Sequence, residues 1–318
     1  MTSPDLTIGF AHAAYQLRDE FLTRNHGTNS FEVRSLDALK ERIGETDILV
    51  VSGLWRNELV AQAPRLRLIQ SISAGTDQFS KPGLHERGIK LASAQGGNEI
   101  AVAEHAIALM LALTRHLHLA RDHQSARHWR PMIADRARRE DELDGKTLLI
   151  VGLGRIGQRL ARLAGAFGMR VIGVKRNPRS VPGVERLVTP AQLLATLPEA
   201  DFVALTCPLT PETEGLIGAS ALAAMKPGAY LVNVARGRVV DETSLIKALT
   251  QGTLAGAALD CVHEEPLPAS SELWRFPNVL VTPHSAGETR RYETRIVDLL
   301  LENIQRLEAG SPLLNEVV

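Results

Sequence analysis

The chain has 318 residues, of which 44% are apolar and 23% charged, a composition typical of a folded globular protein and not of a disordered or fibrous one. Its 36 Lys and Arg residues balance its 36 Asp and Glu residues, so no net charge attracts it to nucleic acid or to an anionic membrane, and we expect neither as a partner. The length exceeds that of one usual hydrophobic core and predicts two domains.

The cysteines and the N-terminal residues bear on the cellular location of the protein. Cys207 and Cys261 are the only cysteines, each in an apolar context, and the start MTSPDLTIGF lacks the basic residues and long apolar core of a signal peptide. The longest apolar helical stretch, IALMLALTRHLHLA (107–120), is interrupted by Arg and His before it reaches the roughly 20 apolar residues that a bilayer requires. We therefore expect a cytoplasmic protein.

The first hundred residues alternate short apolar runs with polar helical stretches, a pattern typical of a small α/β unit. The expected strands are LTIGF (6–10), DILVVS (47–52), LRLIQSI (66–72) and IKLASA (89–94). Residues 99–120 (EIAVAEHAIALMLALTRHLHLA) then predict one long helix. Because this stretch is too apolar for an exposed linker, we expect the helix to be buried where two domains meet.

The middle of the chain predicts a doubly wound parallel sheet, since apolar runs alternate there with helical patterns. The six expected strands are residues 148–152, 170–174, 202–206, 229–234, 256–260 and 279–282. A last helix is predicted by apolar residues at helical spacing, Ile296, Leu299, Leu300, Ile304 and Leu307, with its end marked by Gly310 and Pro312. Its apolar face requires a partner, and the first unit is a candidate.

A glycine loop follows the first strand of this sheet. Gly152, Gly154 and Gly157 have the spacing G-x-G-x-x-G and lie directly between a strand and a helix. The spacing alone is compatible with a mere tight turn. In this context it predicts a dinucleotide site, where glycines let the backbone approach a pyrophosphate at the helix N-terminus.

Two cations follow the second strand of the sheet, where an NAD site usually has an acidic residue. The segment reads VKRNPR, which places Lys175 and Arg176 at this point. Both side chains could simply point to solvent. Alternatively they bind a 2′-phosphate by charge-assisted hydrogen bonds, and on that ground we expect NADP in preference to NAD.

Polar groups follow three later strands of the sheet. Arg236 comes after AYLVNVA, Asp260 ends GAALD with Glu265 five residues later, and His284 follows VLVTP. Ligands bind beyond the carboxyl ends of parallel strands, and these groups suit reduction of a carbonyl that carries an adjacent carboxylate. The guanidinium of Arg236 would bind that carboxylate, His284 would donate a proton to the oxygen, and Glu265 would raise the pKa of His284. Taken singly, each residue could instead be a turn or surface residue.

At this point the chain resembles the D-isomer-specific 2-hydroxyacid dehydrogenases, the family that contains glyoxylate/hydroxypyruvate reductases, D-lactate dehydrogenases and phosphoglycerate dehydrogenases. The motifs span nearly the whole chain: SAGTD (73–77), NEIAVAEHAIALMLALTR (98–115), GLGRIG (152–157), ADFVALTCPLTPET (200–213), LVNVARGRVVDE (231–242), ALDCVHEEPLP (258–268) and TPHSAG (282–287). The resemblance implies an NAD(P)-dependent reductase of a small 2-oxo acid, of the glyoxylate/hydroxypyruvate type, that works in the direction consuming NADPH.

The resemblance also implies roles for individual residues. The implied catalytic set is Arg236, Glu265 and His284. The implied cofactor contacts are Gly152, Gly154, Arg155, Ile156, Gly157, Lys175, Arg176, Cys207, Pro208, Thr213, Val234, Ala235 and Asp260, the last near the nicotinamide carboxamide. The implied substrate contacts are Leu54, Trp55, Ala74, Gly75, Arg236 and His284, with the backbone of Ala74 and Gly75 holding the carboxylate.

The family architecture implies two α/β domains. A Rossmann dinucleotide-binding domain would cover residues 99–286, and a smaller, discontinuous flavodoxin-like substrate domain would combine residues 1–98 with 287–318. One departure affects the cofactor: many members have an acidic residue in place of Lys175, and VKRNPR is similar to the segment of NADP-preferring reductases. NAD therefore stays open as the second choice.

One segment of the chain could be proposed as a metal or nucleic-acid site. The segment RHLHLARDHQSARHWRPMIADRARR (115–139) gathers histidines and arginines, but the histidines lack a zinc-ligand pattern and acidic residues are interleaved with the arginines. We expect no metal there, only an exposed helix and loop that shapes a homodimer contact.

The alternative function is a dinucleotide-sensing interaction protein on the same fold, similar to the corepressors that resemble these enzymes.

Overall fold

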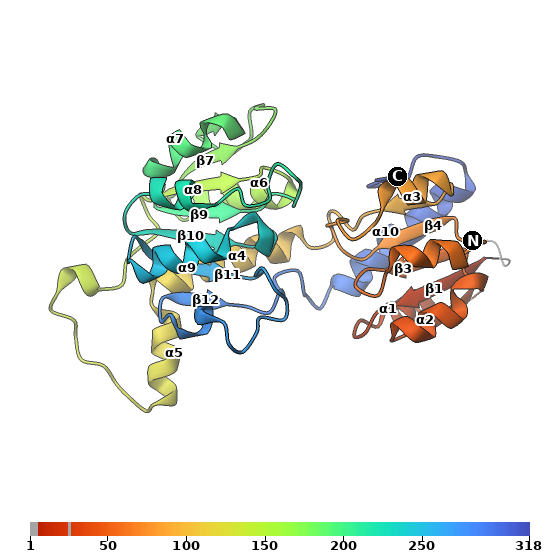
Figure 1. The fold of residues 1–318 in the computed structure, drawn as a ribbon, viewed down its shortest axis with the longest axis horizontal. Helices are drawn as coiled ribbons and strands as arrows, with labels where there is room; N and C mark the ends of the chain where they lie inside the picture. Colours follow the sequence, from red (N-terminus) through yellow and green to blue (C-terminus); the bar gives the residue numbers. More distant parts are fainter. Residues whose placement is uncertain (1–5, 25–26) are drawn as a thin grey trace. The chain divides into compact units, whose positions relative to one another are not determined.

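The chain forms two compact units, one made of Met1–Asn98 with Glu288–Val318 and the other of Glu99–Gly287 (Figure 1). The computed structural model describes residues 6–24 and 27–318. The N-terminal stretch that we expect not to be a signal peptide therefore lies partly outside the described residues.

The first unit contains a parallel five-stranded sheet with the strand order β2-β1-β3-β4-β5, which is the flavodoxin-like order. Its strands are β1 (Thr7–Ala11), β2 (Asn29–Val33), β3 (Ile48–Val51), β4 (Leu68–Ser71) and β5 (Lys90–Ala92). Its helices are α1 (Leu17–Leu22), α2 (Leu36–Arg42), α3 (Lys81–Glu86) and α10 (Tyr292–Glu308). The sequence interpretation missed β2, an edge strand with alternating burial and therefore a weak apolar signal.

The last helix of the chain packs within the first unit. Ile296, Leu300 and Ile304 of α10 are fully buried and share a core cluster with Ile8 and Phe10 of β1. The predicted helix and its end are confirmed, because α10 stops at Glu308, two residues before Gly310, which has a positive φ. The first unit is therefore discontinuous in sequence, and the second unit lies between its two segments.

The second unit contains a parallel seven-stranded sheet in the order β12-β11-β10-β9-β6-β7-β8. Its strands are β6 (Thr147–Val151), β7 (Arg170–Val174), β8 (Arg186–Val188), β9 (Phe202–Leu205), β10 (Ala229–Asn233), β11 (Leu254–Leu259) and β12 (Val279–Val281). All six predicted strands are present. The seventh, β8, was missed because it is a three-residue edge strand that begins with an arginine.

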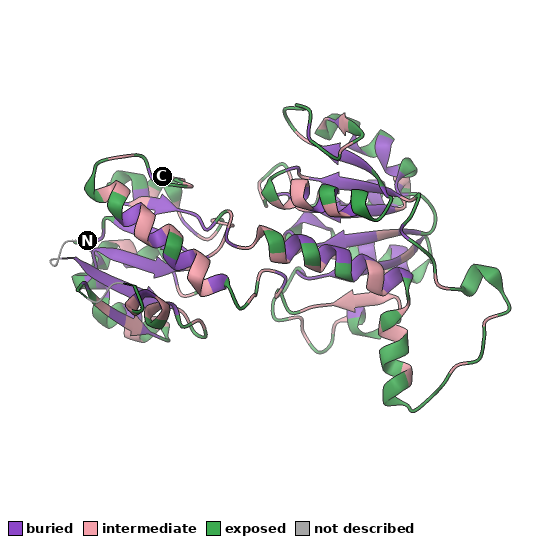
Figure 2. Ribbon diagram, turned by 180° about the vertical axis from the view of Figure 1, so that it is seen from behind, coloured by how far each residue is buried: buried purple, intermediate pink, exposed green. Residues whose placement is uncertain are grey.

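Helices cover both faces of this sheet, so its central strands are buried on two sides (Figure 2). Along β6, Leu149 and Val151 belong to one core cluster, whereas Leu148 and Ile150 belong to another, as expected of residues that point to alternate faces. Each fully buried Leu or Ile contributes about 1.5–3 kcal/mol, which explains why these strands are continuous apolar runs. The other helices of the unit are α4 (Glu99–Thr114), α5 (Leu117–Ser125), α6 (Arg155–Ala166), α7 (Leu193–Thr196), α8 (Ala219–Ala224) and α9 (Glu242–Thr250).

The prediction of one helix over residues 99–120 is wrong. The helix breaks after Thr114, where His116 has a left-handed backbone with φ of 50°. The last carbonyls of α4 are bound by groups outside the helix: the amide of Asp141 donates to Thr114 O (2.9 Å) and the ring of His118 contacts Ala112 O (3.1 Å). The apolar residues of α4 pack against α6, within the second unit.

Over residues 6–24 and 27–318, no single helix has the length and apolarity to cross a bilayer. Only α4 and α5 together, with a bend of 68° between them, meet that criterion by length and composition. Of these two, α4 has many of its residues in the core of the second unit.

Candidate active site

The carboxyl ends of the seven parallel strands lie along one edge of the second sheet, where α/β proteins bind ligands. In sheet order, this edge presents His284 after β12, Asp260 and Glu265 after β11, Arg236 after β10, Cys207 after β9, the glycine loop after β6 and Lys175 after β7. The strand order reverses between β6 and β9, the switch point of a dinucleotide-binding sheet. The candidate residues are therefore ordered along a single edge.

Two of the three loop glycines leave no room for a side chain, and the third borders open space. A Cβ on Gly152, whose φ is 103°, would lie 2.7 Å from the backbone of Cys207, and a Cβ on Gly157 would lie 2.2 Å from Gly152 O. Side chains are thus excluded where the turn meets β9 and α6. Beside Gly154 there is nothing within 4 Å, so this position leaves open space at the N-terminus of α6. Arg155 and Ile156 form the first turn of that helix, where amide groups point outward toward an anion.

The remaining candidates for cofactor contact differ in their environment. Val234 and Ala235 are buried beyond the end of β10, and Pro208 is exposed. Cys207 is 8% exposed, and burial raises the pKa of its thiol to about 11, so the thiol is neutral near neutral pH. The hydroxyl of Thr213 donates to Pro208 O at 2.7 Å. This hydrogen bond joins the two ends of the loop 208–213.

The cations after β7 extend from the sheet edge. Lys175 is half-buried, whereas Arg176 and Arg179 are exposed. Within the described part of the chain, none of the three side chains forms a hydrogen bond or ion pair. Arg176 is close enough to Glu212 to contribute to the lowering of that carboxyl's pKa, which is caused first by a hydrogen bond from Thr210. Positive charge is therefore available beside the expected ribose position.

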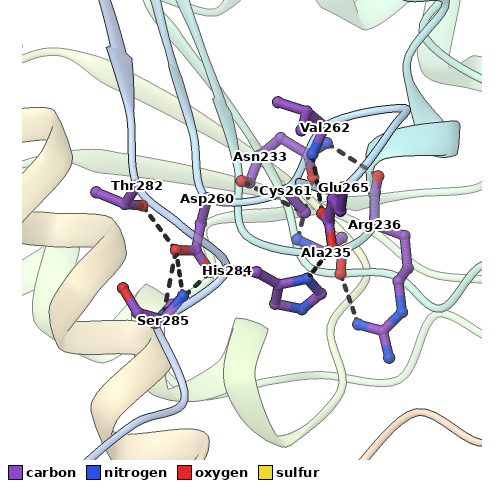
Figure 3. A network of polar contacts seen from close by, with 11 residues as sticks. Asn233, Ala235, Arg236, Asp260, Cys261, Val262, Glu265, Thr282, His284 and Ser285 are labelled. Atoms are coloured by element: carbon purple, nitrogen blue, oxygen red, sulfur yellow. Dashed lines mark hydrogen bonds and ion pairs between the residues drawn. The ribbon is translucent and has the colours of Figure 1, made fainter. Parts of the chain in front are cut away.

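His284 and Glu265 form the polar centre of the edge (Figure 3). The His284 Nδ1 atom lies 2.7 Å from Glu265 Oε2, and the other oxygen of Glu265 accepts the amide of Val262 at 3.1 Å. Because the carboxylate only accepts, Nδ1 carries the hydrogen and Nε2 remains for a ligand. The expected imidazole–carboxylate bond is thus present.

The pair shifts both pKa values toward the charged forms. The hydrogen bond that His284 donates to Glu265 is the largest influence on the pKa of His284 and raises it. Burial and Arg236 lower this pKa, and the charges of Glu265 and Asp260 add to the rise. For Glu265, burial is the largest influence and raises the pKa, but the bond and charge of His284, the Val262 amide and Arg236 together lower it. Both shifts favour the charged forms, an imidazolium next to a carboxylate.

Arg236 is held in place by its own turn. The side-chain amide of Asn233 donates to Arg236 O at 2.9 Å and its carbonyl accepts from Ala235 N at 3.0 Å, while the guanidinium donates to Ala235 O at 2.8 Å. Asn233 is 1% exposed. The sequence interpretation missed this residue, although a lone amide in the apolar run AYLVNV is the signal that could have identified it.

Asp260 does not face open space. Its carboxylate is 3% exposed and accepts hydrogen bonds from the Thr282 hydroxyl (2.6 Å) and from the amides of Ser285 (3.0 Å) and Ala286 (3.2 and 3.1 Å) (Figure 3). The Thr282 and Ser285 contacts were not anticipated from the sequence, because nothing local connects them to a residue 22 positions away. The Asp260 carboxylate therefore binds the loop that carries His284.

The substrate candidates of the first unit lie at the carboxyl ends of its own strands. Ala74 and Gly75 follow β4 in a loop, and within residues 6–24 and 27–318 their amides donate to no acceptor. Leu54 is half-buried after β3. Trp55 is 2% exposed and packs on Phe79, with 5.7 Å between ring centroids. Trp55 is therefore part of the core of this unit, and its expected contact with the substrate stays a prediction.

Replacing Glu265 by Gln tests the electrostatic pairing. Because the bond and charge of Glu265 raise the pKa of His284, the variant should have a lower pKa at this histidine. A proton donor must be protonated, so kcat/KM for reduction should fall as pH rises through this pKa, and that alkaline limb should move to lower pH in Glu265→Gln. The measurement is the pH profile of kcat/KM, with Glu264→Gln as the exposed neighbour control. An unmoved limb would contradict the assignment.

Comparison with known proteins supports the chemistry that the sheet edge suggests. Residues 107–286 match the family described as D-isomer specific 2-hydroxyacid dehydrogenase, NAD binding domain. A glyoxylate reductase from Pyrococcus furiosus is 38% identical over 279 residues, which cover 86% of this chain and 83% of that protein. A solved protein from Thermus thermophilus is 33% identical with a TM-score of 0.87, and the match covers 98% of this chain and 100% of that chain.

A further solved structure carries a dinucleotide. It is an NADPH-dependent glyoxylate/hydroxypyruvate reductase from Sinorhizobium meliloti in complex with NADP and malonate, 27% identical with a TM-score of 0.84, covering 99% of this chain and 97% of that chain. The doubly wound sheet and its glycine loop thus define an oxidoreductase that uses a nicotinamide dinucleotide. The chain belongs to the D-isomer-specific 2-hydroxyacid dehydrogenase family.

Proposed function

We propose that the protein is an NADPH-dependent reductase of small 2-oxo acids, of the glyoxylate/hydroxypyruvate type. The observation that carries the proposal is the 2.7 Å pair of His284 and Glu265 at the sheet edge that also presents Arg236. The glyoxylate reductase of P. furiosus and the S. meliloti enzyme, similar to this chain along most of its length, support the substrate class.

Each group of the edge then has a chemical role. The bound dinucleotide supplies the hydride that reduces the carbonyl carbon. Arg236 binds the substrate carboxylate and polarises the carbonyl with its planar N–H donors. His284 donates the proton from Nε2 to the carbonyl oxygen, and Glu265 stabilises the imidazolium before that transfer. For the first unit, the proposed substrate contacts are the amides of Ala74 and Gly75 and the side chains of Leu54 and Trp55.

The experiment that tests this function is a panel of 2-oxo acids with NADPH and with NADH, followed by loss of nicotinamide absorbance. We expect turnover of glyoxylate or hydroxypyruvate with NADPH. Tight cofactor binding without turnover of any 2-oxo acid would contradict the proposal and favour the alternative, a dinucleotide-sensing interaction protein.

The preference for NADPH depends on Lys175 and Arg176, whose side chains have no acceptor within the described residues. Replacing both by Gln should weaken NADPH binding roughly 100-fold or more and leave NADH binding little changed, because each charge-assisted hydrogen bond contributes about 1.5–3 kcal/mol. Dissociation constants for both cofactors measure this. Arg170→Gln, at the opposite end of β7, is the control. An equal loss for both cofactors would remove the phosphate argument.

We also propose a homodimer formed through the segment that follows α4. Trp129 and Met132 are each 96% exposed in this segment, which projects from the second unit (Figures 1 and 2). Two large apolar side chains so exposed suit a protein contact. Sedimentation equilibrium should show that the parent protein is a dimer and that Trp129→Glu is a monomer. A monomeric parent protein would contradict the proposed dimer.

The cytoplasmic location remains a prediction, which cell fractionation would test.

A further inference from the structure

The backbone at His284 has an unfavourable conformation. Its φ is 53°, in the left-handed region, and it follows directly on Pro283. A residue with a Cβ adopts this region at an energetic cost and keeps it only when the surrounding structure fixes it. Contacts from the surrounding structure must therefore hold the turn that carries the imidazole.

Asp260 holds this turn from both sides. Its carboxylate accepts the hydroxyl of Thr282, two residues before His284, and the amides of Ser285 and Ala286, which follow it. Oδ1 takes part in three of these contacts. A carboxylate that is 3% exposed needs such donors to offset its burial, so the turn and the carboxylate stabilise each other.

A third group completes the network from another element. The Nε2 atom of His105, in α4, lies 3.0 Å from Thr282 Oγ1 and 3.6 Å from Asp260 Oδ1. Asp260 is the acceptor for the Thr282 hydroxyl hydrogen, so Thr282 Oγ1 must accept from His105, which assigns the hydrogen to Nε2. The side chain of His105 is 24% exposed. Its bond fixes the rotamer in which Thr282 reaches Asp260.

We propose that His105 is a positioning residue for His284, acting through Thr282 and Asp260. The inference rests on the proposed function, in which His284 donates the proton. The chain of contacts runs from His105 to the Thr282 hydroxyl, to the Asp260 carboxylate and to the turn 282–286. It fixes the direction in which the imidazole points, and proton transfer depends on that direction. Asp260 accordingly serves to brace this turn.

A double-mutant cycle tests the inference. His105→Leu and Thr282→Val each remove one hydrogen-bonding group, and each should lower kcat roughly tenfold, since small misplacement of a reacting group lowers rates by up to about 100-fold. The Kd for NADPH should stay within about twofold of the parent value. Because both residues act through one chain of bonds, the double variant should be no slower than the slower single variant.

Two further variants separate positioning from general stability. His105→Gln retains an N–H donor and should recover most of kcat, whereas Glu104→Gln, at an exposed neighbouring position of α4, should leave kcat unchanged. Additive losses in the double variant would overturn the inference. So would equal losses in His105→Gln and His105→Leu, or a lower unfolding temperature in His105→Leu with an unchanged kcat. If His284→Gln itself retained the parent rate, the proposed function would fail first.

Discussion

Replacing His284 by Gln should lower kcat for 2-oxo acid reduction roughly 100- to 10,000-fold, the usual contribution of a positioned general acid. The reason is chemical: glutamine retains a polar side chain of similar reach, but its amide does not release a proton. NADPH should still bind with nearly its parent Kd. Steady-state rates and a fluorescence titration of NADPH are the two measurements.

The control for this variant is His263→Gln. His263 is an exposed histidine two residues before Glu265, and its amide donates to Glu242 at 3.0 Å. Its replacement should leave kcat within a few-fold. A His284→Gln enzyme that retained a rate within a few-fold of the parent would show that the proton comes from another group.

Replacing Arg236 by Gln should lower kcat/KM for the 2-oxo acid roughly 100- to 10,000-fold, because two charge-assisted hydrogen bonds of about 1.5–3 kcal/mol each are lost. The effect should appear both in KM for the substrate and in kcat, because Arg236 binds the carboxylate and also polarises the carbonyl. Arg236→Lys should give an intermediate value, since it keeps the charge but loses the planar fork. Kinetics at varied 2-oxo acid and saturating NADPH measure both parameters.

Arg238→Gln is the matched control, two residues away. Arg238 is 53% exposed and pairs with Glu214, so its loss should change neither parameter by more than about twofold, as for other exposed ion pairs. If Arg236→Gln also left KM and kcat unchanged, the substrate carboxylate would bind elsewhere.

Strands of the second sheet were predictable because burial on both faces requires uninterrupted apolar runs. That requirement applies to β6, β9 and β10, which were all identified from the sequence. It does not apply to the edge strands β2 and β8, where few apolar residues are needed and the local pattern is weak. The break after Thr114 was missed for a different reason: it depends on the distant amide of Asp141.

Local chemistry also identified the polar groups of the site. The spacing of Gly152, Gly154 and Gly157, and the ends of strands at Arg236 and His284, are properties of short segments. Why Gly152 tolerates no side chain is visible only in space, because a Cβ there would meet Cys207, which follows another strand.

The sequence by itself determined which residues end the parallel strands, since strand ends follow from apolar runs and the residues that stop them. Tertiary structure alone decided how these ends combine: it set the left-handed turn at His284 and buried Asp260 beneath it. It also brought His105 to Thr282 across 177 positions and placed Trp55 in a core. The direction of a side chain depends on neighbours that lie far away along the chain, and a local sequence pattern does not predict which residues these are.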